Sequence, residues 1–402
     1  MFNLKEVIIS ITNRCNSRCK MCDIPIEKTE ELDTPSWKHI IRDLPSCGAK
    51  TLVFSGGEPL LREDLFELLS FAKSVGLNTC ITSNGIMIDD SVASKLLQTG
   101  INVVNVSVEG PEEVHDLLRG AGNFKKTVLA LAALGKHKIE TTIATTVSRY
   151  TYKNLNSVVE LAKEYNVTTV KFQPFSSLFV DDKKRIKEFT ISENNLQEME
   201  TIIKDVILLS ARYGIAVNPE KYLLNIPYYL SGKSTGSNNV CGALLSSCPI
   251  NSKGEIFPCW VLSGRDNLIG SLKGNSFLSL WGGRRHISII EKIERKGCPS
   301  CMMSCYDGNF GQAGIKHRVI RGLSKLKNRG FRGYLAQLLR KLQKRFKFYF
   351  AYRGSLAALT RKFKGIFRRK AISMTKIQEQ GTEGVFTEIE IAEQMLKDEL
   401  KR

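Results

Sequence analysis

The sequence of 402 residues contains no run of 18 or more apolar residues, which excludes a helix that spans a membrane. Its N-terminus lacks the basic start, the apolar stretch and the small-residue cleavage site of a signal peptide. We therefore expect a cytoplasmic location, where cysteines stay reduced or bind metal rather than form disulfides. The chain has 11 cysteines, and their clustering favours metal.

Acidic residues are missing from residues 316–370, a stretch that contains 19 Lys and Arg. The whole chain has 59 Lys and Arg against 40 Asp and Glu, which gives a formal net charge of +19. The remaining residues are therefore formally neutral as a group. This pattern disfavours a nucleic-acid-binding surface spread over the fold and indicates one local contact with a polyanion.

Apolar residues recur at steps of three and four within the basic stretch. They begin with Phe331, Leu335, Leu338, Leu342, Phe346 and Tyr349. The spacing predicts a pair of basic amphipathic helices, and such helices can lie in an anionic membrane surface. We therefore expect residues 316–370 to hold the protein on the inner face of the membrane. Packing against the protein's own body is the main alternative, and nucleic acid or another acidic partner is the least favoured one.

Short β-branched runs alternate with amphipathic stretches over the first 175 residues. The predicted strands cover residues 7–12, 51–55, 78–82, 102–108, 140–147 and 169–173. The predicted helices lie near residues 35–44, 62–75, 89–99, 122–136 and 153–165. Strands separated by single helices indicate βα units and a parallel sheet. We expect an α/β fold, a partial (β/α)6 barrel of the TIM type, because six units suit an incomplete barrel better than an open sheet.

The chain divides further by composition, with residues 1–180 as the predicted barrel. Residues 181–240 read as a helical connection that ends in a turn-rich loop. Residues 241–310 form a small module rich in loops and cysteine, of a size at which a metal commonly supplies cohesion. Residues 311–375 contain the basic amphipathic helices, and residues 376–402 an acid-leaning C-terminal helix.

Three cysteines, Cys15, Cys19 and Cys22, follow the first predicted strand at C-x3-C-x2-C spacing. Three thiols bound to a four-iron cluster leave one iron open to a substrate, whereas four thiols make a closed electron-transfer site. A structural zinc site needs a fourth Cys or His nearby, and none lies within sixteen residues. The spacing thus favours an iron–sulfur cluster with an open iron.

Short polar motifs follow the next three predicted strands. They are Ser55-Gly56-Gly57-Glu58-Pro59, Thr82-Ser83-Asn84-Gly85 and Ser107-Val108-Glu109-Gly110, with Arg119-Gly120 further along. Each motif alone is typical of a tight turn. In a parallel barrel, however, all of them lie at the carboxyl ends of strands, where such folds place their active sites. The glycines would let the backbone approach a ligand closely.

The cysteine triplet and these motifs together resemble those of the radical S-adenosylmethionine (SAM) superfamily, over about residues 5–175. The resemblance implies that Cys15, Cys19 and Cys22 bind a [4Fe–4S] cluster and that SAM is a second cofactor. It implies SAM contacts from Gly56, Gly57, Glu58, Ser83, Asn84, Ser107, Glu109 and Arg119. Within this set, Glu58 is matched to the methionyl amino group, Ser107 and Glu109 to the ribose, and Arg119 to the carboxylate. Met21 stands where the family often has an aromatic residue.

The resemblance also implies a reaction. Such enzymes cleave SAM reductively to a 5′-deoxyadenosyl radical, which abstracts hydrogen from an unreactive C–H bond; an electron donor such as a ferredoxin or flavodoxin is needed. The basic stretch favours a lipid, an isoprenoid or a lipid-linked sugar as the substrate. The first alternative is a peptide-modifying maturase, and the second is a non-catalytic Fe–S or zinc protein that binds a membrane or RNA. The sequence identifies no catalytic acid or base.

A second group of cysteines contains Cys241, Cys248, Cys259, Cys298, Cys301 and Cys305. A predicted hairpin with Lys253-Gly254-Glu255 at its turn precedes a tight cysteine knuckle, as in zinc ribbons, so zinc is one interpretation. Beside the first cluster, the module resembles the SPASM/twitch extension of radical SAM enzymes, which carries auxiliary [4Fe–4S] clusters. Two four-cysteine clusters need eight thiols, so we expect one auxiliary cluster. Its ligands are Cys248, Cys259, Cys298 and Cys301, or else Cys241, Cys248, Cys259 and Cys305.

Overall fold

A nine-stranded sheet runs through the computed structural model, in the order β6-β5-β4-β3-β2-β1-β7-β8-β9. The strands are β1 (Glu6–Thr12), β2 (Thr51–Gly56), β3 (Asn78–Ser83), β4 (Val103–Ser107), β5 (Thr141–Val147), β6 (Thr169–Pro174), β7 (Ser247–Ile250), β8 (Glu255–Ile256) and β9 (Gly270–Ser271). Strands β1 to β6 pair in parallel in chain order. This order confirms the α/β fold and the partial barrel.

The structure describes residues 4–22, 24, 30–180, 182–233, 243–296 and 301–303. The basic stretch 316–370 and the C-terminal helix predicted in residues 376–402 lie outside these ranges. Within the described ranges, the helices are too short or too polar to cross a membrane.

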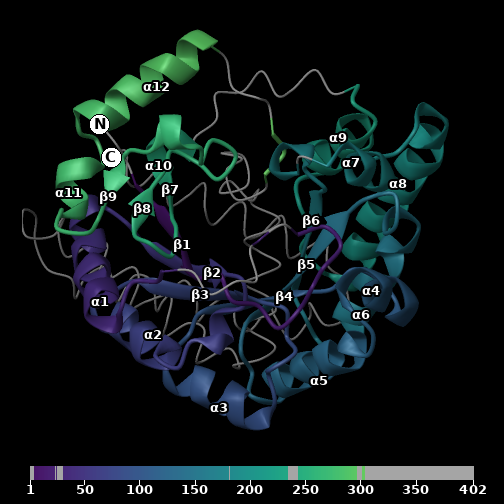
Figure 1. Ribbon diagram of the computed structural model, residues 1–402. Helices are drawn as coiled ribbons and strands as arrows, with labels where there is room; N and C mark the ends of the chain where they lie inside the picture. The colour runs from purple at the N-terminus through teal and green to yellow at the C-terminus, as the bar shows by residue number, and fades with distance from the viewer. Residues whose placement is uncertain are drawn as a thin grey trace, which may run out of the picture. The chain divides into compact units, whose positions relative to one another are not determined.

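Helices fill the connections between the parallel strands and cover the outside of the curved sheet (Figure 1). Those of the barrel are α1 (Thr34–Asp43), α2 (Leu65–Ser74), α3 (Asp90–Gln98), α4 (Glu112–Arg119), α5 (Asn123–Lys136) and α6 (Leu155–Glu164). Those that follow are α7 (Lys183–Phe189), α8 (Leu196–Tyr213), α9 (Glu220–Leu230), α10 (Ala243–Ser246), α11 (Phe277–Leu280) and α12 (Arg284–Lys296). The helix α4 was not among those predicted from the sequence.

Local sequence explains where the barrel helices begin. The Asp33 side chain accepts a hydrogen bond from the backbone N–H of Ser36 at 2.9 Å, and the Asp89 side chain accepts one from Val92 at 2.7 Å. Each bond satisfies a free N–H in the first turn of α1 or α3, and a cap of this kind contributes about 1 kcal/mol. Aspartate is one of the residues most favoured at this position.

The two faces of the sheet differ in burial. Val7, Ile9, Leu52 and Phe54 point to the outer face and are fully buried beneath the helices. The alternate residues point to the interior, because side chains along a strand change face at every step. Many of them are half-buried and polar, among them Ser55, Thr82, Asn105, Thr146, Lys171 and Gln173. The hydrophobic core therefore lies between sheet and helices, and the interior keeps a polar lining.

The strand β7 extends the sheet beyond β1, with Cys248 in register with Val7. A hairpin joins β7 to β8, which pairs with it in antiparallel fashion. Gly254 at its turn has a φ of +79°, a conformation that L side chains rarely adopt. The hairpin predicted around Gly254 is present, and it places the cysteine-rich segment directly beside the first strand of the barrel.

Candidate active site

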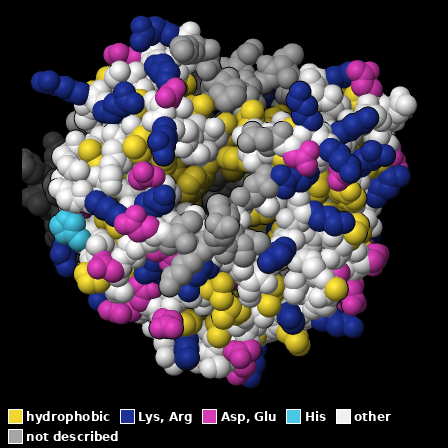
Figure 2. Space-filling model, viewed as in Figure 1, with side chains coloured by type: hydrophobic (Ala, Val, Ile, Leu, Met, Phe, Trp, Pro, Cys, Tyr) yellow, Lys and Arg dark blue, Asp and Glu magenta, His cyan; other side chains and the backbone are white. Residues whose placement is uncertain are grey.

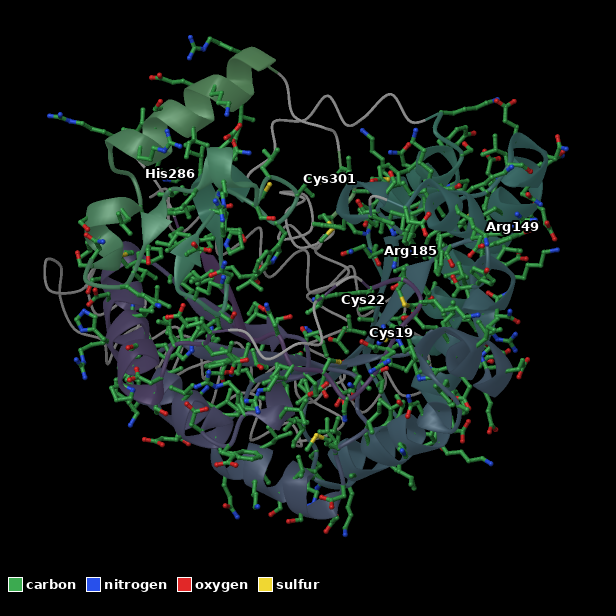
Figure 3. The ribbon with its side chains drawn as sticks, in the orientation of Figure 1. Cys19, Cys22, Arg149, Arg185, His286 and Cys301 are labelled. Atoms are coloured by element: carbon green, nitrogen blue, oxygen red, sulfur yellow. The ribbon has the colours of Figure 1, made fainter. Side chains whose placement is uncertain are left out.

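The loop after β1 carries the first three cysteines to the carboxyl ends of the strands. Cys15 and Cys19 are half-buried, and Cys22 is exposed. The Cys22 N–H donates to the Cys19 carbonyl at 3.1 Å, and Figure 3 shows both side chains on the same part of the loop. Burial raises the pKa of the Cys15 thiol, and the charges of Cys19 and Cys22 add to the rise. The structure thus brings the three predicted thiols together on one loop.

Two glycines at the end of β2 allow this loop to pass against the strand. A Cβ atom on Gly57 would lie 2.1 Å from the Arg14 carbonyl oxygen, and one on Gly56 would lie 2.2 Å from that of Thr12. At this close approach, the Gly57 N–H donates to the Thr12 carbonyl and the Glu58 N–H donates to the Arg14 carbonyl, both at 2.8 Å. The close approach predicted for a ligand is, in the structure, an approach to the backbone of the cysteine loop.

Gly57→Ala tests this packing. We expect it to lower the free energy of unfolding by at least about 1–3 kcal/mol, the usual cost of overpacking, because the clash is with backbone. Denaturant unfolding and iron uptake measure the effect. Gly264→Ala is the matched control, since a Cβ there meets nothing within 4 Å, and its effect should stay within about 0.5 kcal/mol. Equal stabilities for the two variants would contradict this role of Gly57.

Glu58 is fully buried and ties β2 to β3. Its carboxylate accepts hydrogen bonds from the Ser83 hydroxyl at 2.9 Å, the Asn84 N–H at 2.8 Å and the Leu60 N–H at 3.2 Å. Burial raises the pKa of Glu58 to about 7, although these hydrogen bonds oppose the rise. Three of the predicted SAM contacts therefore form one unit whose charge changes near neutral pH.

Asn84 extends this unit to the cysteine loop. Its Nδ2 donates to Oδ1 of Asn16 at 2.7 Å, and its Oδ1 accepts from the Ile86 N–H at 2.9 Å. Asn16 lies between the first two cysteines, and its part in the site was not predicted from the sequence. The only hint was its place inside the cysteine triplet.

A second buried unit joins β4, α4 and the cysteine loop. The Glu109 carboxylate is fully buried, and its Oε1 accepts from Nε of Arg119 at 2.8 Å. Its other oxygen accepts from the Thr146 N–H at 2.8 Å. Nη1 of Arg119 lies 3.8 Å from Sγ of Cys19. Glu109 and Arg119, predicted to contact different parts of SAM, thus pair with each other.

The backbone at the end of α4 also holds the loop. The Ser17 hydroxyl donates to the Arg119 carbonyl at 2.8 Å, and the Lys20 N–H donates to the Leu118 carbonyl at 2.9 Å. The cysteine loop is therefore bonded to three neighbours, at the ends of β2, β3 and α4.

The interior of the barrel contributes residues that the sequence motifs missed. Ser107, a predicted SAM contact, is in register with Ala144, which is in register with Lys171, so all three face the interior. Burial raises the pKa of Glu6 and of the Cys80 thiol, and the Lys171 charge opposes both shifts. Glu6 and Lys171 sit on β1 and β6, so their charges act on each other across the interior.

The half-buried Asn105 amide, which is only partly hydrogen-bonded, also faces this interior. The Asn105 Nδ2 lies 3.2 Å from both the Cys80 sulfur and the Thr82 hydroxyl. Its Oδ1 is buried and has no hydrogen-bond partner among the described residues. If the amide is turned over, its oxygen can accept from the hydroxyl and its NH2 is left unpaired. Either way, one buried polar atom of Asn105 has no hydrogen-bond partner among the described residues. Figure 2 shows the face turned to the viewer hollowed at its centre.

The described cysteines of the second group do not all lie in the same place. Cys259 is buried against Ile8 of β1, an interior residue, with Met303 packed on the same cluster. The Gln173 Nε2 lies 3.3 Å from the Met303 sulfur, and the Tyr222 hydroxyl donates to the Met302 carbonyl at 2.6 Å. Residues 301–303 thus reach β6 and α9, and the structure brings Cys259 and the segment containing Cys301 to the barrel interior.

Cys248 lies elsewhere. It is fully buried, shares the outer face with Val7 because the two are in register, and lies near Cys47 of the short helix that follows α1. The sequence placed Cys248 with Cys259 in both proposed ligand sets. In the structure, Cys248 lies in the main hydrophobic core and Cys259 packs against Ile8 in a separate cluster. Cys241, Cys298 and Cys305 lie outside the described residues.

Comparison with known proteins shows which family this part of the chain resembles. Residues 9–166 match the model of the radical SAM superfamily. The matched range contains the cysteine loop, Glu58, Asn84, Glu109 and Arg119. The match shows that residues 9–166, less than half of the chain, are similar to the radical SAM superfamily.

Several proteins of known function share part of their length with the chain. Fe-coproporphyrin III synthase of Methanosarcina barkeri is 33% identical over 170 residues, which cover 41% of this chain and 43% of that protein. AdoMet-dependent heme synthase of the same organism is 27% identical over 291 residues, covering 67% and 80%. PqqA peptide cyclase of Bradyrhizobium diazoefficiens is 35% identical over 130 residues, covering 31% and 34%. The chain thus spans less than half the length of two of these three relatives.

Solved structures share the fold. Streptococcus suis SuiB bound to the precursor peptide SuiA has a TM-score of 0.59 at 18% identity, covering 72% of this chain and 67% of that one. Native anSMEcpe with bound AdoMet has a TM-score of 0.59 at 20% identity, covering 74% and 88%. These likenesses extend past the matched range 9–166 and agree with a partial barrel.

Radical SAM enzymes use a [4Fe–4S] cluster and SAM as cofactors. The donor set fits such a cluster, because three thiols stand on one loop beside the cation of Arg119. Among the described residues, no three His, Cys, Asp or Glu side chains converge on a point that could hold a single metal ion. A four-iron cluster does not require such a point, since each of its thiolates binds a separate iron.

Proposed function

We propose that the chain cleaves SAM reductively at a [4Fe–4S] cluster held by Cys15, Cys19 and Cys22, and takes hydrogen from a peptide substrate. The observation that carries the chemistry is the bonding of the cysteine loop to the ends of β2, β3 and α4. These bonds fix the loop against the strand ends, where parallel barrels place their reactions. When bound, the two cofactors supply a 5′-deoxyadenosyl radical.

The residues of the strand ends have distinct tasks in this proposal. Gly56 and Gly57 admit the cysteine loop, while Glu58 holds Ser83 and Asn84 in place and supplies negative charge near the cationic groups of SAM. Ser107 and Glu109 at the end of β4 stand where the ribose contact is expected. The three polar strand ends thus form the wall on which SAM is expected to rest.

The buried Glu58 makes SAM binding depend on pH. Its pKa is about 7, so the carboxylate is about 10% ionised one unit below that pH and about 90% ionised one unit above it. Attraction to a cationic ligand is lost as the pH falls through 7, and we expect SAM to bind about tenfold more weakly at pH 6 than at pH 8. Equilibrium binding to the reconstituted protein measures this.

The control for this prediction is Glu58→Gln, which removes the titrating group. It should bind SAM more weakly than the unaltered protein at pH 8 and show only the pH dependence of SAM itself. Parallel curves for the two proteins would mean that Glu58 does not act through its charge.

Two observations support a peptide as the substrate. SuiB, which shares the fold, was solved with a precursor peptide, and PqqA peptide cyclase is 35% identical over part of the chain. The polar interior, with the charge of Lys171, suits a molecule that carries carboxylate and amide groups. The membrane contact expected for residues 316–370 stays a prediction, and no relative named above favours a lipid substrate. A ferredoxin or flavodoxin remains our proposed electron donor.

A tetrapyrrole is the second candidate substrate. It is favoured by the alignment with AdoMet-dependent heme synthase, which covers 67% of this chain and 80% of that protein. That alignment reaches further along the chain than the one with the peptide cyclase. The carboxylates of a coproporphyrin also suit the polar interior.

One assay tests the reaction and separates the two substrates. The whole chain is reconstituted anaerobically with iron and sulfide, reduced with dithionite and given SAM, and 5′-deoxyadenosine is measured. Release with SAM alone supports the radical SAM reaction, and no release from an iron-loaded protein would overturn it. A rise in release on adding a synthetic peptide pool supports the peptide. A rise only with Fe-coproporphyrin III would assign the tetrapyrrole instead.

A further inference from the structure

Arg119 occupies a position that the SAM-carboxylate prediction does not explain. It is the last residue of α4, and its side chain is 14% exposed, between the fully buried Glu109 and the half-buried Cys19. Nε and Nη2 of the guanidinium donate to Oε1 of Glu109, and Nη1 is turned to Sγ of Cys19 at 3.8 Å. The carboxylate thus fixes the group that meets the sulfur.

The other polar contact of Cys19 does not supply a proton to the sulfur. Oγ of Ser17 lies 3.3 Å from Sγ of Cys19. The Ser17 hydroxyl has one hydrogen, and it is donated to the Arg119 carbonyl at 2.8 Å. Arg119 is therefore the side chain that offers an N–H to Cys19, and it does so with a positive charge.

We propose that Arg119, held by Glu109, donates a charge-assisted hydrogen bond to the Cys19 thiolate and so raises the reduction potential of the cluster there. This inference rests on the proposed function, which places a [4Fe–4S] cluster on Cys19. One-electron reduction adds a negative charge, and a nearby cation stabilises the reduced form more than the oxidised form. Hydrogen bonds to the sulfurs and local charge are known determinants of such potentials.

The electrostatics support this orientation. Burial disfavours the charged form of Arg119, yet the negative charges of Glu109, Cys19 and Cys22 outweigh it and raise the pKa of the guanidinium. The pair Glu109–Arg119 is neutral as a whole, but its positive end faces the sulfur. Removing Arg119 also leaves the buried Glu109 carboxylate unpaired near the cluster, which lowers the potential further.

The test is a reductive titration of the reconstituted whole chain with dithionite, followed by electron paramagnetic resonance. The signal that changes on addition of SAM identifies the cluster on the first loop. We expect Arg119→Gln to shift the midpoint potential of this cluster by about 59 mV to more negative values. For a one-electron couple, that shift is a tenfold change in the ratio of reduced to oxidised cluster. Arg119→Lys keeps the charge and should fall between the two.

Arg18→Gln is the matched control, because Arg18 is exposed on the same loop and its substitution removes the same charge. Its midpoint should equal that of the unaltered protein. Unchanged midpoints in both Arg119 variants, with weaker SAM binding, would overturn the proposal and assign Arg119 to the SAM carboxylate. If Arg119→Gln takes up no iron, the midpoint potential of Arg119→Lys alone tests the proposal. A more negative value supports it, and an unchanged value contradicts it. Failure of the unaltered chain to bind a cluster would instead refute the proposed function.

Discussion

Cys19→Ala is expected to reduce the release of 5′-deoxyadenosine from SAM to background. Cys19 is a proposed cluster ligand, and it is also the point where the loop meets Arg119. Replacing a residue behind a metal ligand commonly costs about 10–100-fold in affinity or activity, so loss of the ligand itself should cost more. The measurement is product release by the anaerobically reconstituted chain, with iron content determined on the same sample.

Cys47→Ala serves as the control for this loss. Cys47 is half-buried at the end of the short helix that follows α1, and its Sγ contacts the Asp43 carbonyl at 3.5 Å. Burial raises its pKa to about 11, so it is a neutral thiol remote from the cysteine loop in sequence and in contacts. Cys47→Ala should keep both iron and activity. Normal release by Cys19→Ala would refute the proposed cluster site.

Features of the barrel that depend on local sequence were predictable. The N-caps at Asp33 and Asp89 are such features, because a cap needs only the side chain and the first turn of its own helix. The strand-end motifs were also found from sequence, since parallel strands carry their functional residues at one end. The helix α4 was missed, because Pro111 and Gly110 before it read as a loop.

The partners of the site residues were not predictable in the same way. Glu58 and Ser83 are 25 residues apart and Arg119 and Cys19 are 100 apart, and no motif states which side chain a buried carboxylate will bind. The family resemblance assigned Arg119 to the SAM carboxylate, whereas in the structure its partner is Glu109. A buried charge needs such a partner within the protein, and the pairing follows from the positions of β4 and α4.

The face of the sheet to which a side chain points is a further property that the spacing of residues in the sequence does not determine. A shift of one residue moves a side chain to the other side of the sheet, so the separation of Cys248 from Cys259 depends on the register of β7 with β1. The hairpin around Gly254 is present, with Cys248 on β7 and Cys259 after the end of β8. The sequence did not show that β7 joins β1, and that pairing turns Cys248 toward Cys47.

The same register predicts different outcomes for these two cysteines. We propose that Cys259 and Cys301 belong to the auxiliary cluster and that Cys248 does not. The unaltered chain should then bind about eight irons, four in each cluster. Cys259→Ala should retain about four, whereas Cys248→Ala should retain all of them, because its thiol lies in the hydrophobic core on the other face of the sheet.

Iron and sulfide counting on the reconstituted variants decides between these outcomes. Cys248→Ala removes a buried sulfur and should cost about 1 kcal/mol of stability, as the loss of a small buried group does, without loss of iron. A loss of about four irons in Cys248→Ala would return it to the ligand set and require β7 to turn over when the cluster binds. Retention of all the iron by Cys259→Ala would leave the interior of the barrel without an auxiliary cluster, and zinc bound elsewhere in the cysteine-rich segment would become the better interpretation.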